Sequence, residues 1–212
     1  MTTPSRPSAN RNPAPRSSRH INLFLFDGVE ELDAVGPWEV LAHWTQECPE
    51  DGWSISCVSV DGADVVGSKN LVLGAHGSVA DYPSPDVLIY PGGPGTRRLL
   101  KEEPHLEWVR TQRAEVPLMA SVCTGSLVYA AAGLLTRRPA TTHWASLNLL
   151  SELDPTVVTD VDARFVDDGD LITSAGVSAG VDMALHLVAR FAGTERAQDV
   201  RRGIQYDPEP PV

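Results

Sequence analysis

The chain has few cysteines, no long apolar run and no excess of basic residues, and each of these absences excludes a class of protein. Its three cysteines, Cys48, Cys57 and Cys123, form no CxxC pair, so neither a disulfide framework nor a zinc knuckle is indicated and a reducing cytoplasm is expected. No apolar run approaches the roughly 20 residues that cross a membrane. The net charge of −11 argues against nucleic acid as the main partner.

Nucleotide-binding motifs are missing as well. The glycine-rich stretch Pro91-Gly92-Gly93-Pro94-Gly95 matches neither the GxGxxG fingerprint nor a phosphate-binding GK[ST] loop. We therefore expect no nucleotide cofactor, and we expect no metal. The predicted partner is a small-molecule substrate.

The two ends of the chain differ in composition from its middle. Residues 1–18 are rich in proline, serine, asparagine and arginine and contain no acidic residue, which predicts a disordered tail. They carry no apolar segment typical of a secretory signal. We expect a single domain over residues 19–206 and an irregular tail over residues 207–212.

Short apolar runs alternate with segments of helical pattern, which predicts an α/β fold. Such alternation is typical of βαβ units and of a doubly wound, mostly parallel sheet with helices on both faces. A helix is expected from about Trp38, with Pro37 in its first turn. The predicted main strands are 21–26, 53–60, 86–90, 116–122 and 171–174, and the later helices are 127–135, 178–192 and 194–204.

Cys123 stands on the predicted turn between a buried strand and an Ala-rich helix. The free N–H groups and positive dipole end of that helix are expected to lower the pKa of the thiol below about 8.5. The thiolate form of cysteine is a nucleophile. The alternative is that Cys123 is an inert core residue, which is the usual fate of a free cysteine.

Ligands of open α/β sheets bind outside the carboxyl ends of the strands, and this rule groups several residues with Cys123. Asp33 follows the first strand and is expected to donate or share a proton with the thiol, or only to face a helix dipole. Gly92 and Gly93 follow the third main strand. The N–H groups of Gly93 and Thr124 are expected to form an oxyanion pocket.

His143 is the available base for a Cys–His pair, or else a structural residue. Gly176-Val177-Ser178-Ala179-Gly180 matches the GxSxG motif of serine hydrolases. Only His186 follows it, so we expect these glycines to allow tight packing of a helix on the sheet. Trp38 and Trp144 are expected to pack in helices, or alternatively to line a small apolar pocket.

Five ordered motifs together resemble one superfamily. The set resembles the ThiJ/PfpI superfamily, which is DJ-1-like and belongs to the class I glutamine amidotransferase-like fold, and its closest resemblance is to the isonitrile hydratase branch. The resemblance implies a flavodoxin-like fold and a homodimer. It also implies that Cys123 is the nucleophile, that Asp33 is its carboxyl partner, that Gly93 and Thr124 supply N–H groups, and that His143 is auxiliary. The motifs are FDGVEELD at 26–33, YPGGPG at 90–95, ASVCTG at 120–125, TTHW at 141–144 and TSAGVSAG at 173–180.

Two departures narrow the function that the resemblance implies. Thr124 stands where the PfpI-type peptidases have histidine, and the chain ends at Val212, too soon for the helix-turn-helix domain of AraC-type regulators. The leading expectation is hydration of an isonitrile to an N-substituted formamide through a thioimidate on Cys123. The alternatives are a glyoxalase or deglycase acting on reactive carbonyls, and a ligand-sensing or redox-sensing dimer.

Overall fold

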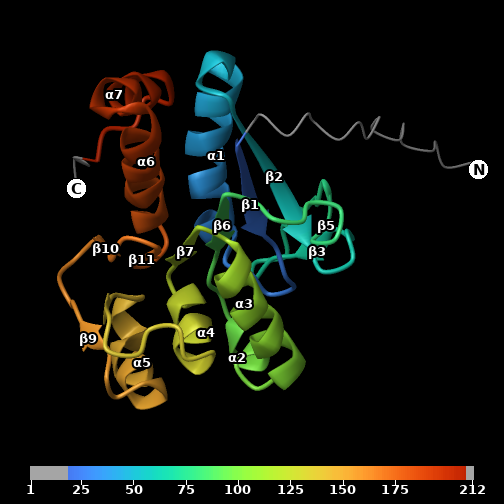
Figure 1. Ribbon diagram of the computed structural model, residues 1–212, viewed down its shortest axis with the longest axis vertical. Helices are drawn as coiled ribbons and strands as arrows, with labels where there is room; N and C mark the ends of the chain where they lie inside the picture. The colour runs from blue at the N-terminus through green and yellow to red at the C-terminus, as the bar shows by residue number, and fades with distance from the viewer. Residues whose placement is uncertain (1–18, 209–212) are drawn as a thin grey trace, which may run out of the picture.

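The computed structural model describes residues 19–208, and a single seven-stranded sheet forms its centre (Figure 1). The strand order is β10-β11-β7-β6-β1-β2-β5, and within this sheet only the β10–β11 pair is antiparallel. The doubly wound, mostly parallel sheet is therefore confirmed. Its strands are β1 (Arg19–Phe24), β2 (Trp53–Ser59), β5 (Gly77–Ser78), β6 (Val87–Tyr90), β7 (Leu118–Val122), β10 (Phe165–Asp167) and β11 (Leu171–Ser174).

The helices form two groups on either side of the sheet (Figure 1). One group consists of α1 (Glu31–Glu47), α6 (Ala179–Ala192) and α7 (Thr194–Gly203). The other consists of α2 (Thr96–Leu99), α3 (Glu103–Glu115), α4 (Gly125–Ala131) and α5 (Leu147–Leu153). Two short ladders lie outside the main sheet, β3 (Val65–Val66) with β4 (Val72–Leu73) and β8 (Pro139–Ala140) with β9 (Val158–Thr159).

The central strands are buried because helices cover both of their faces. Every residue of β6 and β7 is buried, which explains why both segments are continuously apolar rather than alternating. The expected tail over residues 1–18 lies outside the described residues, as do residues 209–212. Asp207 and Pro208 belong to no helix or strand.

The start of α1 corrects one prediction. The helix begins at Glu31, so Pro37 lies inside it rather than in its first turn. Proline has no N–H to donate to the hydrogen bonds of a helix interior. For that reason the sequence predicted a helix that begins close to Pro37. The earlier start places Asp33 in the first helical turn, where its side chain is buried.

The site lies where the winding of the sheet reverses direction. β1 and β6 are parallel neighbours, but the chain continues from β1 toward β2 on one side and from β6 toward β7 on the other. A crevice at the carboxyl ends of the strands is characteristic of such a switch point. Asp33, Gly92 and Cys123 follow β1, β6 and β7 at this edge.

Candidate active site

Cys123 occupies a sharp turn between β7 and α4. Its φ is +57°, a left-handed conformation that costs a non-glycine residue about 1–2 kcal/mol. The backbone holds it there, because its N–H donates to the carbonyl oxygen of Ser174 over 3.0 Å and its own carbonyl accepts from the Thr142 hydroxyl over 2.8 Å. The residue is 6% exposed. β11 and the segment after β8 therefore hold the backbone of the turn in place.

Asp33 reaches the same point from α1 and is fully buried, with 0% exposure. Its Oδ2 accepts the N–H of Gly92 over 3.1 Å. The Cys123 thiol and the Val177 N–H interact with this carboxyl and lower its pKa, but Oδ1 has no partner at hydrogen-bonding geometry. A buried carboxyl oxygen without a partner is costly. It is also the atom on which a transferable proton can reside.

The two side chains affect each other's protonation. Burial is the largest cause that raises the pKa of Asp33, to about 7. Burial, followed by the charge of Asp33, raises the pKa of Cys123 to about 12. The prediction of a lowered thiol pKa is therefore wrong, because the desolvation of sulfur and the adjacent carboxylate outweigh the helix terminus. Near pH 7 the pair is a thiol facing a carboxyl group that is partly ionised.

Thr124 connects the turn after β7 to the glycine loop after β6. Its Oγ1 accepts the Gly93 N–H over 2.8 Å and lies 3.2 Å from the hydroxyl of Thr96. Gly92 packs against the Thr124 backbone so closely that a Cβ there would collide with it. The N–H groups of Gly92 and Gly93 are thus already bonded, to Asp33 and Thr124. That these N–H groups bind an oxyanion stays a prediction. To do so they would have to exchange their present acceptors, Asp33 and Thr124, for the oxyanion.

Two other backbone N–H groups face the sulfur. The N–H groups of Thr124 and Val177 both lower the pKa of Cys123, in opposition to burial. Val177 has a φ of +53°, which is rare for a β-branched residue. Sequence reasoning missed Val177, because a positive φ at valine has no local sequence signal. The only hint was the strand–glycine–helix pattern around it.

His143 belongs to the site region but not to the thiol–carboxyl pair. Its Nδ1 accepts the N–H of Ala145 over 3.3 Å at the start of η2 (Trp144–Ser146). The groups that shift the pKa of Cys123 are Asp33 and the N–H groups of Thr124 and Val177, and His143 is not among them. An auxiliary role for His143 stays a prediction.

The GxSxG motif does not assemble a serine triad among the described residues. The Ser178 hydroxyl contacts Arg164 over 3.4 Å, whereas His186 pairs with Asp167 over 2.7 Å. Gly180 lies against Val122 of β7, where a Cβ would meet the valine side chain at 3.0 Å. Close approach of helix and sheet at this glycine is what the sequence predicted.

The first turn of α1 is braced by the segment after β3. Glu31 accepts the Lys69 N–H over 2.6 Å and the Ser68 hydroxyl over 3.0 Å, and Glu30 pairs with the Lys69 ammonium group. The Glu30 N–H also donates to the Gly92 carbonyl oxygen over 2.9 Å. These carboxylates position the loop and the helix that carry Asp33.

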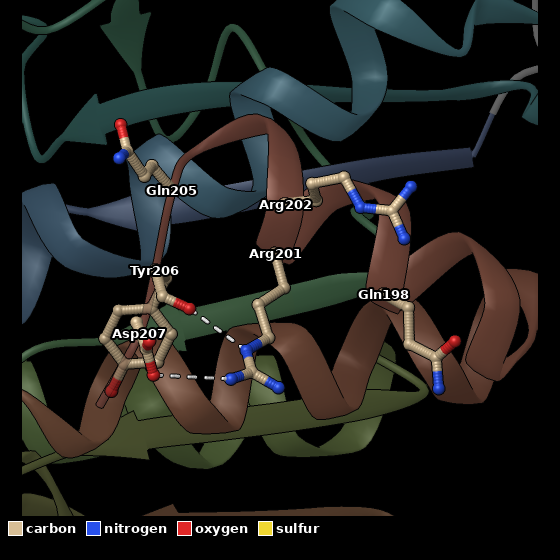
Figure 2. A pocket seen from close by; sticks show the side chains of 6 residues that line it. All are labelled: Gln198, Arg201, Arg202, Gln205, Tyr206 and Asp207. Atoms are coloured by element: carbon tan, nitrogen blue, oxygen red, sulfur yellow. Dashed lines mark hydrogen bonds and ion pairs between the residues drawn. The ribbon is translucent and has the colours of Figure 1, made fainter. Parts of the chain in front are cut away.

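Two cavities among the described residues do not include Cys123 in their lining. One of about 420 Å³ is formed by α7 and the residues after it, where Arg201 binds the Tyr206 carbonyl oxygen over 3.0 Å and Asp207 over 3.7 Å (Figure 2). The hydroxyl of Tyr206, one of its lining residues, donates to Asp182 in the first turn of α6 over 3.0 Å, and Cys123 and Asp33 are not part of its lining. The other cavity, of about 290 Å³, is apolar and includes Trp38, Cys57 and His76 in its lining.

Trp38 and Trp144, which were predicted to pack in helices or to line an apolar pocket, lie in different environments. Trp38 lines the smaller cavity and stacks on His76, with ring centroids 5.2 Å apart, so the apolar-pocket alternative holds for it. Trp144 is 77% exposed, so the expectation that it packs in a helix is wrong. Within residues 19–208 there is no group of three metal-ligating side chains and no helix long and apolar enough to cross a membrane.

Comparison with known proteins identifies the family of this chain. The model of the DJ-1/PfpI family matches residues 19–190. Isonitrile hydratase of Pseudomonas putida is 40% identical over 191 residues, which cover 90% of this chain and 80% of that protein. The HTH-type transcriptional regulator GbdR of Pseudomonas aeruginosa is 30% identical over 98% of this chain, but the matched region is 55% of the regulator.

Solved structures show the same fold. A ThiJ/PfpI family protein from Pseudomonas syringae superposes with a TM-score of 0.82 at 28% identity, over 97% of this chain and 85% of that one. Drosophila melanogaster DJ-1beta superposes with a TM-score of 0.77 at 24% identity, over 90% and 99%. The expected flavodoxin-like architecture is confirmed, and the chain belongs to the DJ-1/PfpI family.

Proposed function

We propose that this chain is a cysteine-dependent hydratase that converts an isonitrile to an N-substituted formamide. The observation that carries the proposal is the buried Cys123–Asp33 pair, in which a carboxyl with a pKa near 7 keeps one oxygen free beside the thiol. An isonitrile carbon must accept a nucleophile and a proton at the same atom. The 40% identity to a protein named isonitrile hydratase supports the same reaction.

In the first step the sulfur of Cys123 bonds to the terminal isonitrile carbon. The Asp33 carboxylate takes the thiol proton and delivers it to that carbon, so the product is a thioimidate, R–N=CH–S–Cys123. A carboxyl with a pKa near the working pH suits both transfers. The N–H groups of Thr124 and Val177 stabilise the negative charge on sulfur as its proton leaves.

In the second step a water molecule adds to the thioimidate carbon. Asp33 takes one proton from that water and passes it to the nitrogen, which gives R–NH–CH(OH)–S–Cys123. The C–S bond then breaks, the proton of the new hydroxyl passes through Asp33 to the sulfur, and R–NH–CHO is released. The oxygen of the formamide thus comes from water, and the sum of the two steps is isonitrile plus water to formamide.

The test is product analysis with cyclohexyl isonitrile in H₂¹⁸O. The proposal predicts N-cyclohexylformamide carrying one ¹⁸O, made by the wild type and by Cys57→Ala, because Cys57 lies outside the site. Trapped thioimidate on Cys123 should appear as a mass addition equal to the isonitrile. Absence of formamide at millimolar isonitrile with a correctly folded protein contradicts the proposal.

A ligand-sensing role is the second candidate, and the match to GbdR over 98% of this chain favours it. A sensor would bind a small molecule without turnover. Reversible binding of isonitrile without formamide would support the sensor, whereas lactate formation from methylglyoxal would support the carbonyl alternative through the same thiol.

The homodimer implied by the family resemblance is part of the proposal. Exposed apolar side chains on two segments that contact each other support it. They are Leu32 and Val35 of α1 together with Val66, Leu71 and Val72 around β3 and β4, and Glu31 joins the two segments through Ser68 and Lys69. Exposed apolar residues on neighbouring segments are typical of interaction surfaces. Sedimentation equilibrium tests it, with a mass of two chains expected for the wild type and a shift toward one chain for Val72→Glu.

A further inference from the structure

The segment after β8 is attached directly to the nucleophile. The Thr142 hydroxyl donates to the carbonyl oxygen of Cys123 over 2.8 Å. Trp144 follows two residues later, and two residues span at most about 7 Å. The Cα atom of Trp144 is therefore within about 7 Å of that of Thr142, a separation that an indole and a small molecule bound at the sulfur can bridge.

His143 determines how this segment sits on the site. Its ring packs against Gly176, where a Cβ would collide with it, and Gly176 precedes the residue whose N–H faces the sulfur. The rings of His143 and Trp144 are 5.4 Å apart. His143 is half-buried and Trp144 is 77% exposed, so the indole beside His143 has an aromatic face that the chain leaves uncovered.

Arg97 bridges this segment and the glycine loop. Its Nη2 lies 3.2 Å from the Ser146 hydroxyl and its Nη1 lies 3.5 Å from the Thr96 hydroxyl. The Thr96 hydroxyl lies 3.2 Å from that of Thr124, the residue after the nucleophile. The guanidinium is thus held between two walls of the site by neutral hydroxyl groups.

Arg97 is an exposed cation that is not neutralised by a carboxylate. Within residues 19–208 no ion pair joins it to an acidic side chain, which is also true of Lys101 and Arg137, but Arg97 is the one of these three that is hydrogen-bonded to Thr96 and Ser146. The adjacent Arg98 pairs with Glu102 over 2.8 Å. A guanidinium has five N–H donors in a planar fork that matches a carboxylate, and two hydroxyl contacts leave donors free.

We propose that Trp144 and Arg97 form a specificity rim that selects an isonitrile whose organic group is an aromatic ring bearing a carboxylate. The ring stacks on the indole, the carboxylate binds the guanidinium, and the isonitrile carbon points to Cys123. This inference rests on the proposed hydratase function and names its substrate class. The rim residues act in binding, so they are expected to change KM rather than kcat.

The kinetic test compares 4-isocyanobenzoate with its methyl ester. The wild type is expected to prefer the carboxylate at least about 10-fold in kcat/KM. Arg97→Gln should abolish this preference through KM and leave the ester unchanged. Arg98→Gln is the matched control, because it removes the same charge one residue away and should keep the preference. The rim proposal is overturned if both variants lose the preference for the carboxylate equally, or if the wild type does not prefer the carboxylate over the ester.

A second measurement does not depend on turnover. The rate at which 4-(bromomethyl)benzoate alkylates Cys123 is compared with that of its methyl ester, by mass spectrometry of the Cys123 peptide. The carboxylate-to-ester ratio should fall several-fold in Arg97→Gln and stay unchanged in Arg98→Gln. Trp144→Ala should slow both aromatic reagents but not iodoacetamide. An unchanged ratio in Arg97→Gln contradicts the proposal.

The two measurements separate the two hypotheses. Turnover of both isonitriles without discrimination would overturn the rim and keep the hydratase. No turnover of either isonitrile, with the alkylation ratio dependent on Arg97, would overturn the hydratase and keep the rim as the recognition element for an aromatic carboxylate.

Discussion

Two neighbouring turns of this molecule look alike and contribute differently. β7 and β11 are adjacent parallel strands in which Val122 pairs with Ser174, and each leads through a glycine-containing turn into a helix. Each turn holds one non-glycine residue in the left-handed region, Cys123 at +57° and Val177 at +53°. The first turn presents a side chain to the site, and the second presents a backbone N–H.

A sequence motif and an active site do not coincide in this pair of turns. The second turn carries the more familiar letters, GVSAG, yet the Ser178 hydroxyl contacts Arg164 rather than a histidine. In the proposed mechanism the first turn is reactive only because Asp33 reaches it from α1. The mechanism therefore makes the chemistry at this edge depend on a third element, the helix that supplies the proton-transfer group.

The largest difference in activity is expected between substitutions of the side chains that the two turns carry, Cys123 and Ser178. Cys123→Ala should lower formamide production at least about 1,000-fold, because it removes the atom that bonds to the substrate. Ser178→Ala should leave activity within about twofold, because the hydroxyl takes no part in the mechanism. Initial rates with matched far-UV circular dichroism check both. Substantial activity in Cys123→Ala would remove the nucleophile from the account.

The second-largest effect is expected at Asp33, the residue that α1 contributes to the site. Asp33→Asn should lower kcat by roughly 100- to 10,000-fold, because the amide cannot carry the thiol proton to the isonitrile carbon. Glu39→Gln, an exposed position on the same helix, is a suitable control. A loss in Asp33→Asn of less than about tenfold in single-turnover rate would exclude Asp33 as the proton carrier.

Asp33 should also affect stability in a pH-dependent way. Its pKa is raised from 3.8 to about 7 in the folded protein, so the folded state binds this proton more tightly than the unfolded state. Stability from this group is present below about pH 4 and is lost as pH rises through about 7. At pH 8 Asp33→Asn should therefore unfold with a free energy higher by on the order of 2–4 kcal/mol.

Urea unfolding at pH 5 and pH 8 measures this linkage. The advantage of Asp33→Asn over the wild type should be larger at pH 8 than at pH 5. An advantage that is equal at both pH values would show that the carboxyl is not titrating in this range.

The smallest effect concerns the strained turn. Val177→Gly keeps the N–H and relieves a left-handed valine, so activity should stay within about threefold and the free energy of unfolding within about 1 kcal/mol. Val181→Gly, the same change inside α6, should destabilise by more than 1 kcal/mol. If Val177→Gly reduced activity much more than Val181→Gly, the valine side chain itself would be needed.

The sequence predicted the part of the site that local patterns determine. Apolar runs identified β6 and β7, and the rule that ligands bind beyond strand ends brought Asp33, Gly92 and Cys123 together. The direction of the Cys123 pKa shift was missed, because the depth of burial and the proximity of a carboxylate are tertiary properties. The left-handed backbone at Val177 and the exposure of Trp144 depend on neighbouring elements in the same way.

The most direct test of the central claim, that Cys123 and Asp33 share one proton, is the pH dependence of Cys123 alkylation by iodoacetamide from pH 4.5 to 9.5. The account predicts a rate that rises through an apparent pKa near 7 in the wild type, and loss of that step in Asp33→Asn, whose rate rises only at high pH. A wild-type rate that is already maximal at pH 5 would mean a free low-pKa thiolate and would contradict the account.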